Sequence, residues 1–136
     1  MPFPTTLGSS KEYQDSAVMI ALSTYPTATA TATASDANTS AVTINAGQGI
    51  ITSPALTTST VYSLIVTNSV VSANDIVWIG LQNGTNTATV FAACGLVTVK
   101  NGSFSVMISN INTAAHNGTI QLCFGIDKPV SKTVAD

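Results

Sequence analysis

The chain has 136 residues, of which 45% are hydrophobic and only 7% are charged, and its net charge is −2. This length suits a single domain. All four basic residues are lysines, so the electrostatic footprint of a nucleic-acid-binding protein is missing. No stretch reaches the ~20 apolar residues that a membrane-spanning helix needs.

The low charge content is the most informative property of the composition. Soluble domains typically carry about 25% charged residues. In this chain the surface must instead be hydrated through the neutral polar side chains of Thr, Ser, Asn and Gln. Such a surface loses little hydration when it is pressed against another protein. The composition favours a surface built for assembly, and the alternative is a secreted protein with a neutral surface.

Residues 1–16 are expected to form an extended N-terminal arm, because the segment has neither helical nor alternating periodicity and is rich in proline, glycine and serine. Its apolar side chains, Phe3, Leu7 and Tyr13, are the predicted contacts with a partner. The arm is either disordered, as many termini are, or ordered on that partner.

A secretory signal is a second interpretation of the N-terminal region. The apolar run 17–22 follows Lys11 but also two acidic residues, whereas a signal peptide is cationic up to its apolar run. A cleavage-like sequence at Ala28–Ala30 keeps secretion open as an alternative. Residues 17–23 are otherwise long enough for a short strand or one helical turn.

Residues 27–34 read TATATATA, which has the period of two that is typical of an extended strand. Alanine methyl groups would lie on one side and threonine side chains on the other. Because both faces are small, the segment suits a sheet edge, a close approach of another backbone, or a low-complexity linker. Its threonines are predicted to contact a partner: Thr27, Thr29, Thr31 and Thr33.

The next part of the chain is expected to alternate between turns and short strands. Residues 36–40 favour a turn, residues 41–45 a short strand, and residues 47–49 a break. Ile50 and Ile51 then lead to a second break at residues 53–54.

Three later segments alternate between apolar and polar residues, namely 61–68, 103–109 and 119–125, and the last two are predicted to be half-buried antiparallel strands. Their predicted core residues are Tyr62, Leu64, Val66, Phe104, Val106, Ile108, Ile120, Leu122 and Phe124. Residues 76–81 read IVWIGL and are apolar on both faces. This predicts a central strand, or a strand beneath a second layer.

Asn-Gly occurs three times and favours a two-residue type I′ hairpin turn. A turn at Asn101-Gly102 would pair Lys100 with Ser103, Val99 with Phe104, Val97 with Val106, and Gly95 with Ile108. A turn at Asn83-Gly84 would pair Val77 with Val90 and Ile76 with Phe91. Asn117-Gly118 is expected instead to close a longer loop between strands 103–110 and 119–126.

Short strands with turn signals about every ten residues predict an all-β fold, either an antiparallel β-sandwich or a jelly-roll-like barrel. Seven to nine strands would fit. The predicted organisation is the arm at 1–16, a β-sandwich body at 17–128, and a flexible C-terminal tail at 129–136.

The sequence contains no recognisable arrangement of catalytic residues, and we expect no enzymatic activity. His116 is the only histidine and, beside an Asn-Gly pair, is expected on an exposed loop tip. It has no second histidine for a metal, and no carboxylate pair or phosphate-binding loop stands out. We therefore predict no catalytic residue, no metal and no cofactor.

Three aromatic residues, Tyr62, Trp78 and Phe91, could line a carbohydrate-binding platform. Because they lie within strongly apolar segments, core packing is the favoured interpretation. Cys94 and Cys123 are too few for a disulfide framework or a zinc site. Buried free thiols are the default for them, and a single bridge is the alternative in an oxidising compartment.

The N-terminal MPFPTTLGSS and the stretch NGSFSVMISNINTAAHNGTIQLCFGI at 101–126 resemble small virion proteins of tailed bacteriophages, and the capsid decoration or cement proteins in particular. The shared features are a proline-bearing N-terminal arm, a low-charge body rich in Thr, Ala and Ser, and strands closed by Asn-Gly. It implies a β-rich body, often a homotrimer, that binds the lattice of the major capsid protein on the outside of the head. It also implies assembly in the host cytoplasm and an arm that reaches over neighbouring capsid subunits.

Two other functions are possible from the sequence. One is a tail-fibre or appendage module that binds host glycan, which exposure of Trp78 would favour. The other is a secreted surface β-domain, which cleavage near Ala30 or a Cys94–Cys123 bridge would favour. Neither a nucleic acid nor a membrane is an expected partner.

Overall fold

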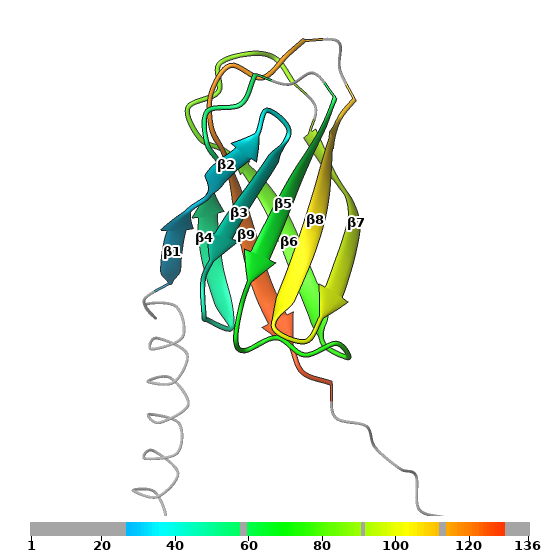
Figure 1. Cartoon of the computed structure of the whole chain (residues 1–136). Coiled ribbons are helices and arrows are strands. Elements are labelled where there is room, and N and C mark those ends of the chain that lie inside the picture. The colour runs from blue at the N-terminus through cyan, green and yellow to red at the C-terminus, as the bar shows by residue number, and fades with distance from the viewer. Residues whose placement is uncertain (1–26, 58–59, 91, 112–113, 130–136) are drawn as a thin grey trace, which may run out of the picture.

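A computed structural model describes residues 27–57, 60–90, 92–111 and 114–129. The described residues form nine strands and no helix, arranged as two sheets packed face to face (Figure 1). The all-β sandwich that the sequence predicts is confirmed. The expected arm at 1–16, the segment at 17–23 and most of the tail at 129–136 lie outside the described residues.

Sheet A contains four strands in the order β1-β4-β9-β6. Their bounds are β1 Ala28–Thr31, β4 Gln48–Thr52, β9 Ile120–Asp127 and β6 Ile76–Asn83. Sheet B contains five strands in the order β2-β3-β5-β8-β7. Their bounds are β2 Thr33–Asp36, β3 Thr39–Thr43, β5 Val61–Thr67, β8 Ser103–Asn110 and β7 Ala92–Lys100.

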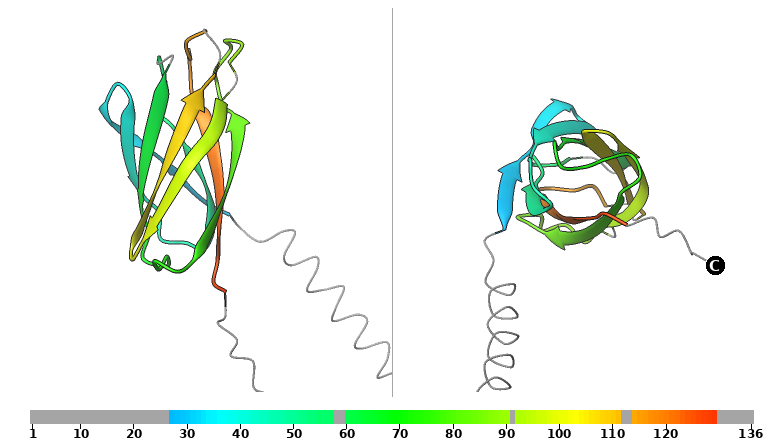
Figure 2. Two further views of the ribbon diagram at one scale, coloured as in Figure 1. Left: turned by 90° about the vertical axis from the view of Figure 1, so that its right-hand side faces the viewer. Right: turned by 90° about the horizontal axis from the view of Figure 1, so that it is seen from below.

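The sheets are mixed rather than wholly antiparallel. β1 and β4 are parallel, as are β3 and β5. Parallel neighbours cannot be joined by a tight hairpin, and here the connections pass through strands of the opposite sheet. Seen from below in Figure 2, the two sheets face each other across the core.

The core lies between the inward faces of the two sheets. The predicted core residues of β5, β8 and β9 are all buried, as their alternation indicates. Phe104 of β8 and Phe124 of β9 join the sheets, with ring centroids 5.4 Å apart and planes tilted by 54°. Such pairs add about 0.5–1.5 kcal/mol beyond the burial of their area.

The hairpin between β7 and β8 has the predicted register next to its turn. Lys100 pairs with Ser103, Val99 with Phe104, and Val97 with Val106. The prediction for Gly95 is wrong, because a bulge between Cys94 and Val97 shifts the register and places Cys94 opposite Ile108.

The turn of this hairpin is not type I′. Gly102 has a φ of +81°, and no described residue other than glycine has a positive φ. A type I′ turn needs positive φ at both central residues, whereas type II needs it only at the second. Hydrogen bonds from Gly102 N to Val71 O and from Ala73 N to Asn101 Oδ1 hold the turn against the β5–β6 loop.

The predicted Asn83-Gly84 hairpin is wrong. β6 pairs with β9, not with β7, so Val77 lies opposite Ile126 and Ile76 opposite Asp127. β6 is also an edge strand of sheet A, not the central or covered strand that its sequence predicts. Asn117-Gly118 lies in a long β8–β9 loop, as expected.

Candidate functional site

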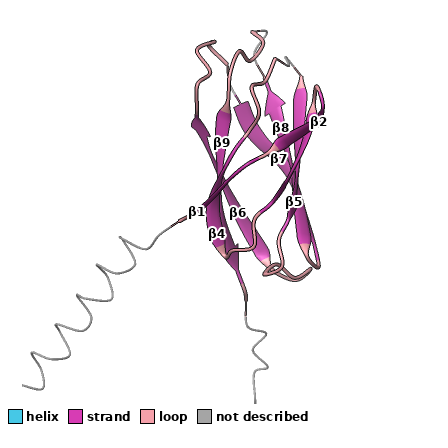
Figure 3. Ribbon diagram, turned by 60° about the vertical axis from the view of Figure 1, so that its left-hand side comes forward, coloured by secondary structure: helices cyan, strands magenta, loops and turns pink. Residues whose placement is uncertain are grey.

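The TATATATA segment forms one edge of the sandwich. β1 lies at the edge of sheet A and β2 at the edge of sheet B, and the chain crosses between the sheets at the buried Ala32 (Figure 3). Ala28 and Ala30 pack against the core. Because β1 and β2 are both edge strands, the prediction of a sheet edge is confirmed.

The four threonines of this segment are all exposed, and we refer to them together as the threonine edge: Thr27, Thr29, Thr31 and Thr33. Among the described residues, β1 pairs only with β4 and β2 only with β3. The other side of each strand therefore presents backbone groups that another chain could pair with. A shallow pocket of about 330 Å³ lies where the segment crosses, lined by Ala30, Thr31, Thr33, Ala41, Val42, Thr43 and Thr67.

The charges of the described residues lie at the ends of the strands. Asp75, Lys100, Asp127 and Lys128 share one end of the sandwich, which we call the charged end, and Asp36 ends β2 at the other. The start of β1 and the end of β9 also lie toward the charged end (Figure 1). The middle of both outward faces carries no formal charge.

Asp75 and Lys128 form an ion pair of 2.6 Å at the charged end. The hydrogen bond from Lys128, together with that from the Ser72 backbone, lowers the pKa of Asp75. This carboxylate is thus a capping and pairing group, not a general base beside a histidine. The described residues contain no cluster of three His, Cys, Asp or Glu side chains that could hold a metal.

Trp78 is exposed, with 63% of its surface accessible, so the expectation that it packs in the core is wrong. It lies on the outward side of β6, where apolar Ile76 is also exposed. Tyr62 is buried as expected, and burial raises the pKa of its hydroxyl. Phe91 lies outside the described residues.

The outward face of sheet A surrounds Trp78 with small and amide side chains. The strand registers place Trp78, Gly125 and Gln48 in one row across β6, β9 and β4, and Gly80, Cys123 and Ile50 in the next. We call this set the Trp78 face. From the sequence, Trp78 is a possible member of a carbohydrate platform, but core packing is favoured because IVWIGL is apolar at every position. The residues that the registers place around Trp78 come from β4 and β9 and have no signal in the sequence around it.

Sheet B also exposes apolar side chains. Ile65 of β5 and Met107 of β8 are exposed diagonal neighbours, and Leu96 projects from the β7 bulge. None of these three side chains is aromatic, so they do not form a stacking surface like the one at Trp78.

His116 is buried, with 3% of its surface accessible, so the expectation of an exposed loop tip is wrong. His116 is buried because the chain at Gly118, two residues later, runs close to the β6–β7 loop. A Cβ on Gly118 would lie 2.7 Å from Asn86 N, so the β8–β9 loop packs directly against the β6–β7 loop. Burial lowers the pKa of His116, whose Nδ1 has no hydrogen-bond partner among the described residues.

Side-chain amides join the β6–β7 and β8–β9 loops. These loops lie at the end of the sandwich opposite the charged end, which we call the loop end. Asn117 Oδ1 accepts hydrogen bonds from Thr87 N at 2.7 Å and Ala88 N at 3.0 Å. Asn117 N in turn donates to Asn86 Oδ1 at 2.8 Å. The side-chain amide of Asn117, which the sequence marks only as part of a turn, therefore holds the two loops together.

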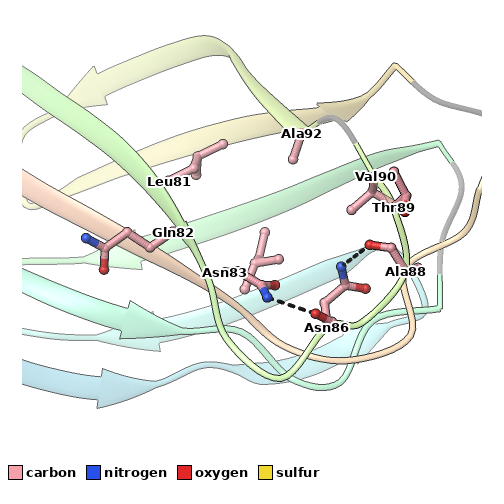
Figure 4. A pocket seen from close by; sticks show the side chains of 9 residues that line it. Leu81, Gln82, Asn83, Asn86, Ala88, Thr89, Val90 and Ala92 are labelled. Atoms are coloured by element: carbon pink, nitrogen blue, oxygen red, sulfur yellow. Dashed lines mark hydrogen bonds between the residues drawn. The ribbon is translucent and has the colours of Figure 1, made fainter.

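A pocket of about 350 Å³ opens beside these loops, between the end of β6 and the start of β7 (Figure 4). Asn83 donates to Asn86 O, and Asn86 donates to Ala88 O, so both amides serve the loop itself. Gln82 is the lining amide that also belongs to the outward side of β6. The pocket lies at the loop end of the strand that carries Trp78.

Both described cysteines are free. Cys94 is exposed on β7, contrary to the default of a buried thiol, although partial burial raises its pKa. Cys123 is half-buried on the outward side of β9. Phe3, Leu7 and Tyr13, the predicted contacts of the arm, lie outside the described residues.

Comparison with protein-family models, with curated proteins and with solved structures gives no match. The part of the chain that the structure describes contains no helix long and apolar enough to cross a membrane.

Proposed function

We propose that this chain is a non-enzymatic virion structural protein, a decoration or cement protein that binds the lattice of the major capsid protein on the outside of a phage head. The observation that carries the proposal is the uncharged threonine edge, which continues into sheet faces without formal charge in their middle. Docking such a surface strips no water from ions, and an open edge offers backbone groups for pairing.

The positions of the chain ends support the same proposal. β1 begins at the charged end, so an arm formed by the preceding residues would join the body directly before the threonine edge. An arm that contacts a neighbouring capsid subunit through Phe3, Leu7 and Tyr13 would therefore bring the threonine edge to that subunit. Many copies on a repeating lattice, arranged as homotrimers according to the resemblance, would gain from avidity even if each contact is weak.

The test is binding of the purified chain to undecorated phage heads. Thr29→Lys with Thr31→Lys places two charges on the threonine edge at exposed positions, and deletion of residues 1–14 removes the arm. Both variants should fold and lose head occupancy. Thr98→Lys, at an exposed position of β7 on the opposite edge, is the control and should bind normally. Full occupancy by the edge and arm variants would overturn the proposal.

A second candidate function is a phage appendage module that binds host glycan. The exposure of Trp78 favours it, because an accessible indole ring is a common stacking surface for sugars. Binding of the isolated chain to a glycan array, without binding to heads, would favour this function over the first.

A further inference from the structure

The Trp78 face combines an exposed aromatic ring with missing side chains beside it. Gly125 lies directly across the strand pair from Trp78, and Gly80 lies two residues further along β6. A Cβ built on either glycine would meet no atom within 4 Å. The two glycines therefore leave an open shelf of backbone next to the indole ring, where other strands would carry side chains.

Amide side chains surround this shelf. Gln48 continues the row of Trp78 and Gly125, while Gln82 and Gln121 lie opposite each other one row beyond Gly80. Among the residues that the structure describes, these three side-chain amides make no hydrogen bond, so their donors and acceptors are available to a ligand. At about 3.3 Å per residue, Trp78 and Gln82 lie about 13 Å apart along β6.

The charges near the Trp78 face determine which ligands it suits. Asp127 is the only formal charge on the outward side of sheet A, and it lies opposite Ile76 at the charged end. The neighbouring Lys128 is already paired with Asp75. The strands of sheet A carry no lysine on this face, and Lys100 belongs to β7 of sheet B. An anionic ligand on the Trp78 face would thus be repelled by Asp127, whereas a neutral ligand would meet no such repulsion.

We propose that the Trp78 face binds a neutral pyranose sugar chain. One sugar ring would stack its apolar face on the indole of Trp78 and rest on the shelf formed by Gly80 and Gly125. Its hydroxyl groups, and those of the next ring, would exchange hydrogen bonds with the amides of Gln48, Gln82 and Gln121. The inference rests on the second candidate function, whose ligand class and site it specifies, and it does not depend on the lattice attachment proposed above.

Trp78 is the only tryptophan of the chain, so its fluorescence reports on this site directly. The full chain is titrated with neutral hexaoses that have glucose, N-acetylglucosamine or galactose units, and with hexagalacturonate as an anionic probe. At least one neutral probe should give a saturable blue shift and should protect Trp78 from iodide quenching. Hexagalacturonate should give neither effect.

A side chain introduced on the shelf should block sugar binding without changing the stability of the fold, so it tests binding separately from folding. Gly80→Val adds a side chain in open space and improves strand propensity, so it should keep the melting temperature and raise the Kd of the neutral probe about tenfold or more. Ala41→Val, at an exposed position of β3 on sheet B, is the matched control and should leave the Kd unchanged. Trp78→Ala, measured by calorimetry, should abolish binding.

Three results would overturn the proposal. The first is that no neutral probe perturbs Trp78, and the second is that Gly80→Val binds as the wild type does. The third is a blue-shifted emission that reddens on dilution, because it would assign the Trp78 face to a second copy of the chain. Loss of head binding with normal sugar binding would instead refute only the lattice attachment.

Discussion

Trp78 lies directly opposite Gly125 across the β6–β9 pair, on an open sheet face, in a chain that has no other tryptophan. With 63% of the residue accessible, its indole is solvated in the folded state. We expect the native protein to emit near the wavelength of the unfolded chain and to be quenched freely by iodide. A strongly blue-shifted native emission from dilute protein would contradict the exposed position.

Gly118 lets the β8–β9 loop lie against the β6–β7 loop. In Gly118→Ala the new Cβ would stand 2.7 Å from the backbone of Thr85 and Asn86. Because backbone cannot move aside as a flexible side chain can, we expect a loss of about 1–3 kcal/mol in the free energy of unfolding, measured by urea denaturation. Gly47→Ala, where the added carbon meets nothing within 4 Å, should change it by less than about 0.5 kcal/mol.

Asn117 should hold the β6–β7 loop through its side chain. Asn117→Ala removes the acceptor of the Thr87 and Ala88 amides and the donor to Thr87 Oγ1. The expected cost is about 1 kcal/mol, with faster hydrogen exchange at those two amides. Asn117→Asp keeps the acceptor oxygen and should preserve their protection. Equal exchange in all three proteins would show that the side chain does not hold the loop.

His116 should make stability fall as the pH decreases. Burial lowers its pKa in the folded state below the ordinary value of 6.5. The unfolded chain therefore binds the proton first, so the free energy of unfolding declines as the pH falls through about 6.5 and levels off below the folded pKa. We expect His116→Leu to flatten this dependence between pH 8 and pH 5. An unchanged profile would mean that His116 is not the titrating group.

The sequence predicts the core well where apolar and polar residues alternate. β5, β8 and β9 each place one apolar set inward, because a slip of one residue would expose that set. The small residues of TATATATA indicate an edge for a similar reason, since they fill little space. Which side chains face the core, and which segment is too small to fill it, both depend on the order of neighbouring residues, so they can be predicted from the sequence.

The Trp78 face and His116 could not be predicted in the same way. IVWIGL is apolar at every position, so its periodicity does not distinguish a covered strand from an edge strand with an open apolar side. Whether β6 pairs with β7 or β9 is decided by the whole topology. Likewise, Asn117-Gly118 looks like an exposed turn, but contact with Asn86, 31 residues earlier, buries its neighbour His116.

The most direct test of the proposed function is to look for the chain in phage particles assembled in cells that produce it, by protein composition and electron cryomicroscopy. The account predicts a copy at each equivalent site on the outer surface of the head, with the threonine edge against a capsid subunit. Heads that lack the chain, or a chain found only on tail appendages, would contradict it.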